Sequence, residues 1–499
     1  MDEYQKAKAA IKCGKSSGED GIAPEVLKHV PIDDVVLNFI NEAHMSGEQP
    51  KLWRTMNIIP VPKSGDLTKT DNYRGISLSS QVAKTANRMI LNRLRPILDP
   101  LLRNSQNGFR PERTTVGQIL ALRRILEGVR ERNLSAVITF IDFQKAFDTI
   151  HRGKLMNILR AYGVPEKMVQ TIEANHSQTR AKVQTCDGDT NVFEILAGVL
   201  QGDTLAPFLF IIAMDHALRL AISGREEELG LTLVPRKSRR VHPIMVTDLD
   251  YADDIALISD TAEKGRALLL TVEKECRKIG LKLNAKKTKV MSVNTEDKTI
   301  TTADGTELES VEDFKYLGAW TASTEQDLKV RRALAWKALH GMRRVWSSDM
   351  GEDLKRRLFV ATVESVLLYG AETWTLTAQQ EKALDGVYTR MLRMALGVTW
   401  MDHIRNVDLY GDLPRVTDKI RERRMRLAGH CVRHPELEAS KLILWEPTHG
   451  KARRGKKRTT YIDVLRRDCL ADNTAELKSL MMDRTVWRTA IQESRVGVG

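Results

Sequence analysis

Residues 248–259 read DLDYADDIALIS, and residues 136–142 read AVITFID. In the first stretch two apolar runs flank Asp253 and Asp254, a pattern typical of a hairpin with polar residues at its turn. In the second stretch a β-branched, apolar run ends at Asp142, which predicts a buried strand. A carboxylate at a strand end is costly unless water, a partner or a metal ion solvates it. Adjacent strands of one sheet would bring the three carboxylates together as a site for Mg²⁺.

Such a site has a defined chemistry. Two divalent ions about 3.5–4 Å apart can activate an attacking 3′-hydroxyl and stabilise a leaving pyrophosphate. The alternative is that the Asp253-Asp254 pair only forms the turn, for which Asp is well suited. Asp248 and Asp250, just upstream, illustrate that alternative, and we assign them no role from the sequence.

The rest of the chain predicts an α+β protein with an α-rich end. Residues 321 to about 426 carry Leu, Val, Ala and Met at helical spacing, and a basic loop is expected at 450–458. Further strands are expected at 57–62, 289–293 and 314–320, and helices at 24–30, 82–98, 149–161 and 264–279. Residues 198–220 are expected to form a Gly-containing loop followed by a buried helix.

Charge favours a polyanionic partner. The chain has 78 Lys and Arg against 65 Asp and Glu, which gives +13. Residues 415–460 alone hold 14 basic and 5 acidic residues, although a solvated charge-rich helix is the alternative there. The N-terminal residues lack the apolar core of a signal peptide, and the apolar run 206–214 is too short to span a bilayer.

Three motifs resemble those of one family in its order along the chain. YADD (251–254), FIDFQKAFDTI (140–150) and GVLQGDTLAPFLF (198–210) are similar to the catalytic boxes of reverse transcriptases, in the form used by non-LTR (LINE-type) retrotransposons. With flanking motifs the resemblance covers about residues 12 to 320. A KSSGEDGIAPEVLK segment (15–28) resembles the N-terminal extension of LINE and group II intron enzymes, which retroviral enzymes lack.

The resemblance implies the catalytic and metal-binding residues. Asp142, Asp253 and Asp254 are expected to hold two Mg²⁺ ions, with Mn²⁺ as a substitute, and Phe143 is included in the metal set. Lys287, in GLKLNAKKTKVM, is the candidate for protonating the leaving pyrophosphate, with Lys286 and Lys289 as neighbours that compete for the role.

The resemblance also implies a nucleotide site. Lys63 and Arg74 would grip the triphosphate as a point charge and a fork donor, against the alternative of an exposed basic loop. Phe147 would exclude a ribose 2′-hydroxyl, although the residue taken alone suits a core. Gln201 and Gly202 fit a site where backbone must approach the nucleotide closely.

Template and primer contacts are implied by two further segments. Arg110, in NGFRPERTT (107–115), is the expected phosphate contact near the template. The segment FKYLG resembles the primer grip, which gives the candidates Phe314, Tyr316, Leu317 and Gly318.

These likenesses imply a right-hand polymerase fold. Residues 1–320 would form fingers and palm, with 1–135 mainly fingers and 136–320 mainly palm. Residues 321–426 would form a helical thumb, and 427–499 a basic C-terminal segment that binds nucleic acid.

The implied function is RNA-directed DNA synthesis by a retrotransposon enzyme, with an RNA template, a DNA primer and dNTPs as partners and no membrane. We expect no endonuclease domain, because the chain begins at the fingers, and a nuclear location with a cytoplasmic RNA-bound phase. The alternative is a truncated or domesticated nucleic-acid-binding protein without polymerase activity. A group II intron maturase or retron enzyme is disfavoured by FIDFQKAFD and the C-terminal pattern. The sequence leaves the oligomeric state open.

Overall fold

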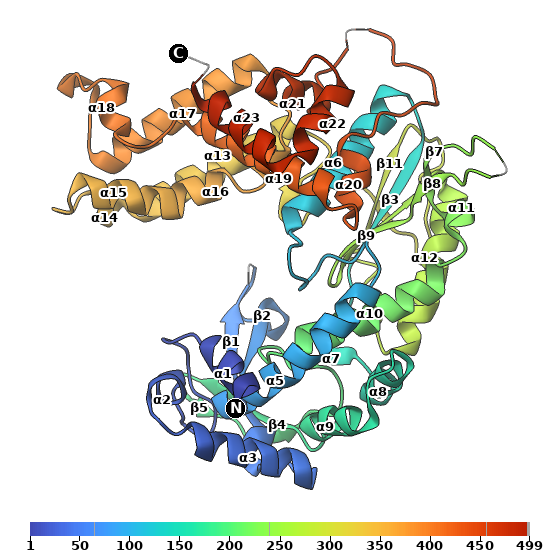
Figure 1. The fold of residues 1–499 in the computed structure, drawn as a ribbon, viewed down its shortest axis with the longest axis vertical. Helices are drawn as coiled ribbons and strands as arrows, with labels where there is room; N and C mark the ends of the chain where they lie inside the picture. Colours follow the sequence, from blue (N-terminus) through green and yellow to red (C-terminus); the bar gives the residue numbers. More distant parts are fainter. Residues whose placement is uncertain (64, 239, 456, 497–499) are drawn as a thin grey trace.

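The computed structural model describes residues 1–63, 65–238, 240–455 and 457–496. Figure 1 shows a curved molecule in which the N-terminal elements and the helices after residue 321 lie at opposite ends. Helices α10 (Ala206–Ile222) and α12 (Ala262–Lys278) run along the side that joins the two ends (Figure 1). Within the described ranges, no helix combines the length and apolar character needed to cross a membrane.

The N-terminal end is built on a small mixed sheet. Strand β1 (Thr55–Pro62) pairs antiparallel with β2 (Tyr73–Leu78) and parallel with β4 (Arg180–Thr185). The short strands β5 (Gly188–Asp189) and β6 (Phe193–Glu194) both pair with β4. Helices and a 3₁₀ turn accompany this sheet: α1 (Asp2–Ala9), α2 (Pro24–His29), α3 (Asp33–Ser46), α4 (Lys51–Arg54), η1 (Thr70–Asn72) and α5 (Gln81–Leu98).

A second sheet occupies the middle of the molecule. Strand β3 (Ala136–Ile141) lies between β10 (Asp254–Ser259) and β11 (Lys289–Val293), with β9 (Asp248–Tyr251) and β12 (Glu309–Ser310) at the two edges. Its pairs are antiparallel except for β11 with β12. This sheet carries the carboxylates that the sequence singled out.

Both faces of the central sheet are covered, because successive residues of a strand point to opposite sides. Val137 and Ile141 of β3 pack into one core with α10 and α12. Ala136, Ile138 and Phe140 pack into a second core with α6 (Thr115–Glu131). Burial on both faces explains why AVITFI reads as a continuous apolar run.

Several short elements connect these parts. Strands β7 and β8 pair with each other, as do β13 and β14. The connecting elements are η2 (Asp99–Leu101), α7 (Ala146–Thr149), α8 (Arg152–Ala161), α9 (Glu166–His176), α11 (Glu226–Leu229), β7 (Leu231–Val234), β8 (Ile244–Val246), β13 (Lys315–Tyr316) and β14 (Ala319–Trp320).

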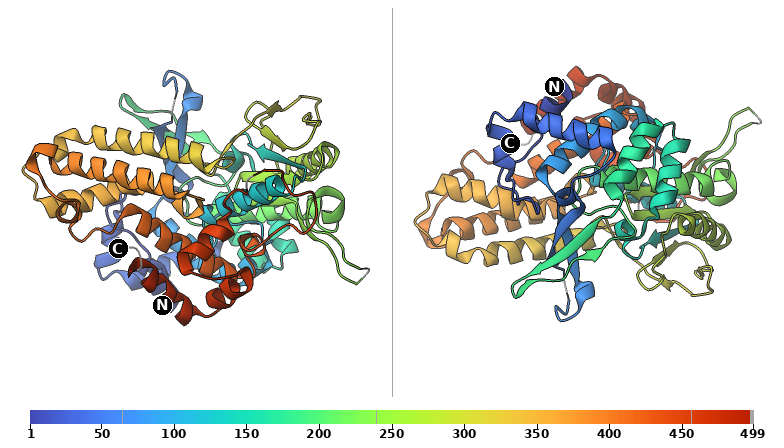
Figure 2. Two further views of the ribbon diagram at one scale, coloured as in Figure 1. Left: turned by 90° about the horizontal axis from the view of Figure 1, so that it is seen from above. Right: turned by 90° about the horizontal axis from the view of Figure 1, so that it is seen from below.

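The segment after residue 321 is helical and has its own core around Phe359, Trp374 and Tyr388. Figure 2 shows two of its long helices, α13 and α17, side by side. The elements of this segment are α13 (Thr324–Gly341), α14 (Arg343–Trp346), α15 (Glu352–Phe359), the π-helical turn η3 (Val360–Glu364), α16 (Ser365–Leu367), η4 (Ala371–Thr373), α17 (Ala378–Leu396), η5 (Trp400–Asp402), α18 (Asn406–Tyr410) and α19 (Val416–Arg433).

The C-terminal helices fold back onto the central sheet. Trp445, Tyr461 and Leu465 belong to the same core as α6. The boundary expected at residue 426 falls inside α19, which therefore belongs to both the helical segment and the C-terminal part. The remaining helices are α20 (Glu438–Ile443), α21 (Tyr461–Cys469), α22 (Thr474–Met482) and α23 (Arg484–Val496).

The mixed α and β content, with an almost wholly helical segment after residue 321, is confirmed. The buried helix expected behind a Gly-containing loop within 198–220 is confirmed. It begins at Ala206, after Gly198 and Gly202, which have positive φ angles. One helix start was wrong: the helix expected from Thr149 begins at Arg152, after the separate turn α7.

Candidate active site

The turn between β9 and β10 carries Asp253 and Asp254. Tyr251 pairs with Asp254, so Ala252 and Asp253 form a two-residue turn. Ala252 has φ 58°, a left-handed conformation that is uncommon for a residue with a Cβ. Surrounding contacts must hold this conformation, and they are described below.

Asp142 lies beside this turn on the neighbouring strand. Ile141 pairs with Ile255, so the antiparallel register continued by one residue sets Asp142 opposite Asp254. Two residues of the 284–288 segment fix Asp142. Asn284 donates its Nδ2 to Oδ2 of Asp142 at 3.1 Å, and Thr288 accepts the Asp142 backbone N–H at 3.2 Å.

The three carboxylates interact through space. Burial, followed by repulsion from Asp253 and Asp142, raises the pKa of Asp254 to about 6. Burial also raises the pKa of Asp253, with a further contribution from Asp142. A cation at this point would relieve that repulsion, and an oxygen-only donor set suits a hard divalent ion.

The ligands are nevertheless not gathered around one point. Among the described residues, no three His, Cys, Asp or Glu side chains have the spacing of a metal site. The Phe143 ring is buried in the core. Because this side chain has no oxygen, only the backbone carbonyl of Phe143 can be a metal ligand. The oxygen donors suit magnesium. The three carboxylates interact electrostatically, but their oxygens are not arranged at the spacing of metal ligands.

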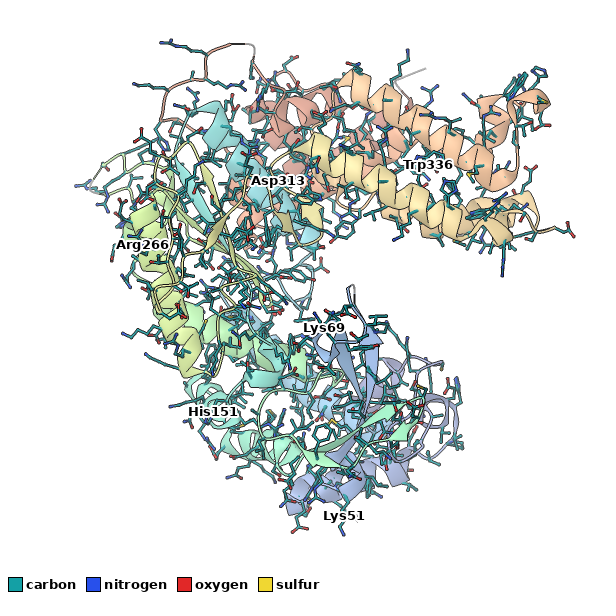
Figure 3. The ribbon with its side chains drawn as sticks, turned by 180° about the vertical axis from the view of Figure 1, so that it is seen from behind. Lys51, Lys69, His151, Arg266, Asp313 and Trp336 are labelled. Carbon is teal, nitrogen blue, oxygen red and sulfur yellow. The ribbon has the colours of Figure 1, made fainter. Side chains whose placement is uncertain are left out.

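Arg74 connects the N-terminal sheet to these carboxylates. It is exposed on β2, and its positive charge partly offsets the raised pKa of Asp253. Lys63 lies beyond the end of β1, where its Nζ donates to the Asp71 carbonyl at 3.4 Å. Figure 3 labels Lys69 near the tip of this β1–β2 hairpin, which points from the N-terminal end toward the rest of the molecule.

The loop with Gln201 and Gly202 is tied to the same hairpin. Ser77 of β2 donates its backbone N–H to the Gln201 carbonyl at 2.9 Å. Gly202 has φ 108°, and a Cβ there would lie 2.4 Å from the Ser77 carbonyl oxygen. Glycine is therefore required in this structure for a close approach to β2, whatever it also does for a nucleotide.

Phe147 stands in an aromatic group at the edge of the core. Its ring stacks on Phe210 with centroids 4.3 Å apart, and Phe109 meets it edge-on at 6.1 Å. The Phe147 side chain remains half-buried, so one side of the ring is available for contact.

Arg110 is buried and its donors are used inside the protein. The guanidinium donates to Oδ1 of Asp99 at 3.1 Å and to the carbonyls of Arg103 and Gln106 at 2.8 and 3.0 Å. A template contact would require some of these bonds to break. The contacts themselves shape the loop that leads to Gln106.

The remaining predicted residues lie around the central sheet. Lys287 is exposed next to Asn284, and among the described residues its ammonium has no hydrogen bond or ion pair. Leu317 and Gly318, at φ 47° and 86°, form the turn between β13 and β14. Tyr316 donates its hydroxyl to the Leu249 carbonyl at 2.9 Å, and Phe314 stacks on Phe140 at 4.1 Å, so this hairpin is docked on the sheet.

Sequence reasoning missed the segment that clamps the Asp253 turn. Oε1 of Gln106 accepts the backbone N–H of Ala252 at 2.9 Å and that of Gly108 at 2.7 Å. A Cβ on Gly108 would lie 2.3 Å from the Ala252 nitrogen, so the two backbones touch. Gln118 of α6 supports the clamp by donating to the carbonyls of Ser105 and Asp250. The only signal was proximity to the NGFRPERTT motif.

A buried ion cluster lies behind the same turn and gives Asp248 and Asp250 a role. Arg103 contacts Asp250 at 2.7 Å, Asp248 at 2.9 Å and Asp215 at 3.5 Å. Tyr162 donates its hydroxyl to Asp215 at 2.9 Å. Burial and then the charge of Asp248 raise the pKa of Asp250 well above its ordinary value, and the positive charge of Arg103 opposes that rise.

The sequence is similar to those of known proteins. A family model described as "Reverse transcriptase (RNA-dependent DNA polymerase)" matches residues 61–321, more than half of the chain. The chain is 24% identical over 405 residues to "Retrovirus-related Pol polyprotein from type-1 retrotransposable element R2" of Popillia japonica, covering 79% of this chain and 54% of that protein.

Two Drosophila melanogaster proteins are similar over more of the chain. "Probable RNA-directed DNA polymerase from transposon BS" is 26% identical over 485 residues, covering 92% of this chain and 51% of that protein. "RNA-directed DNA polymerase from mobile element jockey" is 23% identical over 470 residues, covering 89% and 49%. The chain spans about half the length of these curated relatives.

Proposed function

The chain belongs to the reverse transcriptase family, and from that membership we propose that it extends a DNA primer with dNTPs on an RNA template. The observation that carries the proposal is the register that sets Asp142 opposite Asp254, with Asp253 beside them and Arg74 within electrostatic range. Relatives named as polymerases of retrotransposons support the same activity.

Asp142, Asp253 and Asp254 are the residues that would hold two Mg²⁺ ions, or Mn²⁺ in their place, with the Phe143 carbonyl as a further oxygen. When bound, such ions lower the cost of deprotonating the primer 3′-hydroxyl and of releasing pyrophosphate. The protein's own part is to fix the carboxylates. Asn284 and Thr288 hold Asp142, and Gln106 holds the turn that carries Asp253.

The nucleotide would lie between the β1–β2 hairpin and the central sheet. Lys63 and Arg74 would bind its triphosphate, since both are exposed on that hairpin and Arg74 already acts on the field at Asp253. Phe147 would contact the sugar, and Gln201 with Gly202 would form the backbone beneath it. Lys287 lies near Asn284, and its ammonium has no hydrogen bond or ion pair within the part of the chain that the structure describes, so it would protonate the pyrophosphate.

The wider assignment follows a right hand. Residues 1–135 correspond mainly to fingers and 136–320 mainly to a palm whose sheet carries the carboxylates. Residues 321–426 correspond to a thumb, which their separate helical core supports. The hairpin of Phe314, Tyr316, Leu317 and Gly318 joins palm to thumb, where it would bind the primer. The basic C-terminal part would bind nucleic acid. The protein would be located in the nucleus, with a cytoplasmic phase in which it is bound to its RNA.

The experiment that tests this proposal measures dNTP incorporation on poly(rA)/oligo(dT) with Mg²⁺. Wild type should incorporate dTMP, and Asp253→Asn/Asp254→Asn should abolish incorporation without loss of fold. The matched control is Asp187→Asn/Asp349→Asn, which removes two exposed carboxylates outside the candidate site and should stay active. A folded wild type that binds RNA in a salt-sensitive way but incorporates nothing would favour the nucleic-acid-binding alternative.

A further inference from the structure

A large cavity lies between α6 and the C-terminal part, away from the Asp253 turn. Its volume is about 730 Å³. The cavity is bounded by the last turns of α6, by residues 321–325 and by the loop that precedes α21. Helix α6 links it to the candidate active site, because Gln118 in its first turn supports Asp250 and Arg130 in its last turn lines the cavity. Twelve residues of helix separate the two points by about 18 Å.

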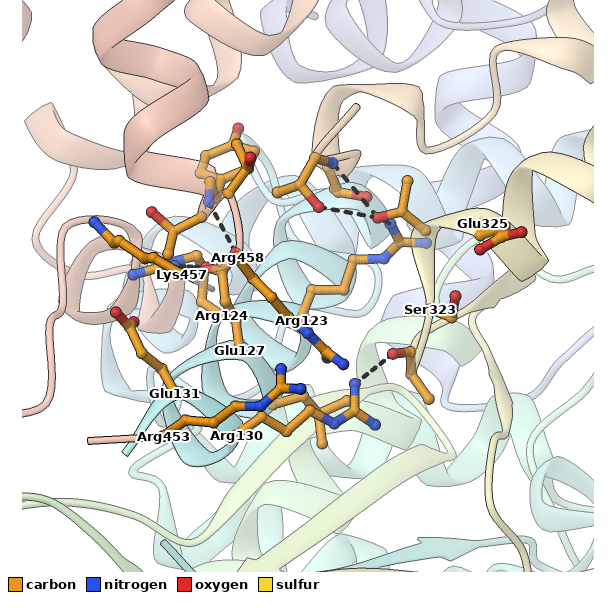
Figure 4. A pocket seen from close by; sticks show the side chains of 18 of the residues that line it. Arg123, Arg124, Glu127, Arg130, Glu131, Ser323, Glu325, Arg453, Lys457 and Arg458 are labelled. Atoms are coloured by element: carbon orange, nitrogen blue, oxygen red, sulfur yellow. Dashed lines mark hydrogen bonds and ion pairs between the residues drawn. The ribbon is translucent and has the colours of Figure 1, made fainter. Parts of the chain in front are cut away.

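Basic side chains line this cavity from two sides. Helix α6 supplies Arg123, Arg124 and Arg130, and the loop supplies Arg453, Lys457 and Arg458. Figure 4 shows the guanidinium ends of Arg130, Arg453 and Arg458 pointing toward one another. Lys456, which belongs to the same basic stretch RRGKKR (453–458), lies outside the described residues.

Some of these cations are already satisfied. Arg123 contacts Asp327 at 2.8 Å, and Arg124 pairs with Glu127 and donates to the Leu442 carbonyl at 3.2 Å. Arg453 and Arg458 differ, since among the described residues neither side chain has a hydrogen bond or ion pair. Two exposed guanidiniums of the lining are therefore free for a ligand.

Two cations near the free pair are only partly compensated, although Arg123 pairs with Asp327, Arg130 donates to the Ala322 carbonyl, and Glu131 and Glu325 also line the cavity. Burial, and then the charge of Arg458, lowers the pKa of Arg130, which means that the two guanidiniums repel each other. The Nε of Arg123 has no hydrogen-bond partner among the described residues, although this side chain is only 8% exposed. An anion bound in the cavity would reduce the repulsion between Arg130 and Arg458 and would accept a hydrogen bond from Nε of Arg123.

Three helices also begin at the cavity wall. Ser323, Thr377 and Thr460 line it, and they are the N-cap residues of α13, α17 and α21, which have 18, 19 and 9 residues. The N-terminus of a helix carries about half a positive charge and favours anions. The Thr377 hydroxyl donates to Gln380 and the Thr460 hydroxyl to Asp463, so among the described residues only the Ser323 hydroxyl keeps its donor for a phosphate oxygen.

The loop is held in place by its backbone rather than by its charges. Arg453 donates its backbone N–H to the Glu131 carbonyl at 2.9 Å. Gly450 has φ 85°, and a Cβ there would lie 2.5 Å from the Arg132 carbonyl oxygen, so the loop presses on the end of α6. The wall of the cavity therefore exists before any ligand binds, and the Arg453 and Arg458 side chains add charge to it.

We propose that this cavity binds the phosphodiester backbone of a single-stranded nucleic acid, as a second site distinct from the polymerase centre. The inference rests on the proposed function for the source of the strand. Pockets of ~300–1,000 Å³ hold ligands of drug size, so a few linked nucleotides fit and a duplex does not. The lining offers no exposed ring for base stacking, because the Tyr461 side chain is only 1% exposed. Binding is therefore through phosphates and independent of sequence.

The test compares the full chain with Arg453→Ala/Arg458→Ala, a variant that removes no side-chain hydrogen bond or ion pair among the described residues. Fluorescence anisotropy measures the affinity for mixed-sequence 12-nucleotide single strands between 50 and 300 mM salt, with RNA and DNA in separate arms. We expect about tenfold weaker binding at ~100 mM salt, and a slope of log K against log salt that falls by about 1.4, or roughly 0.7 per lost phosphate contact. The arm with the larger loss identifies the sugar.

The matched control is Lys154→Ala/Lys167→Ala, which removes two exposed positive charges from α8 and α9 and should keep the wild-type slope. A slope of the Arg453/Arg458 variant equal to that of this control overturns the proposal. Competition by a poly-glutamate peptide of equal charge, as effective as that by unlabelled oligonucleotide, also overturns it. Poly(rA)/oligo(dT) extension by wild type and by Asp253→Asn/Asp254→Asn reports on the polymerase proposal separately, since those two carboxylates lie outside this cavity.

Discussion

Oε1 of Gln106 accepts the backbone N–H of Ala252 at 2.9 Å, directly behind the turn that carries Asp253. The same oxygen accepts the N–H of Gly108, so one side chain satisfies two buried donors. Gln106 itself is fully buried. This bond explains how Ala252 is kept at a positive φ, and it makes Gln106 a positioning residue for the carboxylate next to it.

Gln106→Ala should therefore lower catalysis more than it lowers substrate affinity. Two buried N–H groups lose their acceptor, which costs about 1–3 kcal/mol of stability. A carboxylate displaced by about 1 Å can cost on the order of 100-fold in rate. Steady-state kinetics on poly(rA)/oligo(dT) should show a fall in kcat with a nearly unchanged KM for dTTP. An equal loss of stability with unchanged kcat would reduce Gln106 to a purely structural residue.

Arg103→Met should destabilise the protein strongly. The variant would leave Asp215, Asp248 and Asp250 buried without their guanidinium, and breaking a buried ion pair costs about 3–5 kcal/mol. Urea unfolding measures the loss. Arg160→Met, which removes an exposed pair with Glu166, is the control and should have little effect. Similar midpoints for the two variants would show that the cluster does not stabilise the β9 strand.

Gly202→Ala should impair the candidate site. Gly163→Ala is the control that distinguishes backbone strain at a positive φ from a steric clash of the new Cβ. Both glycines have positive φ angles, so each substitution costs about 1–2 kcal/mol in backbone strain. Only at Gly202 does the new Cβ meet backbone, 2.4 Å from the Ser77 carbonyl oxygen, whereas Gly163 has open space. Incorporation of dTMP should fall in Gly202→Ala and persist in Gly163→Ala. Equal activity of the two variants would mean that the contact between the loop and β2 is dispensable.

Phe147→Ala should relax the choice between deoxyribose and ribose. If the half-buried ring contacts the sugar, its removal opens space for a 2′-hydroxyl, and the preference for dTTP over UTP should drop by about tenfold or more. The ratio of kcat/KM for the two nucleotides measures it. Phe109→Ala removes the edge-on partner of the ring and should keep the preference. An unchanged ratio in Phe147→Ala would leave the ring with a packing role alone.

The strands and their carboxylates were predictable because the signal is local. AVITFI is apolar throughout since both faces of β3 are buried, and DLDYADDIALIS shows its turn between two strands. Gln106 and Arg103 were not predictable in this way. Their partners Ala252 and Asp250 lie 146 and 147 residues farther along the chain, so nothing near them in sequence announces the contact.

The same limit applies to Arg110 and to Asp248. Arg110 is expected to contact a template phosphate because its segment resembles a motif of the family, and only the fold supplies the carbonyls to which its guanidinium donates. Asp248 was assigned no role from the sequence, because its ion pair with Arg103 forms only in the fold. The spacing of the carboxylates along the sequence does not predict which of them face each other, because the register between β3 and β10 decides this.

The C-terminal part was expected to be a basic segment that binds nucleic acid. Its charge gave no indication that its apolar residues also form a core with α6. Trp445 is 7% exposed, donates its Nε1 to the Leu233 carbonyl at 3.0 Å, and packs so closely on α6 that a Cβ on Gly128 would lie 2.4 Å from its ring. Trp445→Ala should therefore destabilise the protein by about 3–5 kcal/mol. Trp400→Ala, at a position that is 77% exposed, is the matched control and should leave the free energy of unfolding almost unchanged. Calorimetry of the full chain decides between two arrangements. A single transition that shifts as a whole in Trp445→Ala means that the C-terminal helices and the central sheet unfold together, whereas loss of a separate minor transition would mean that they form independent units.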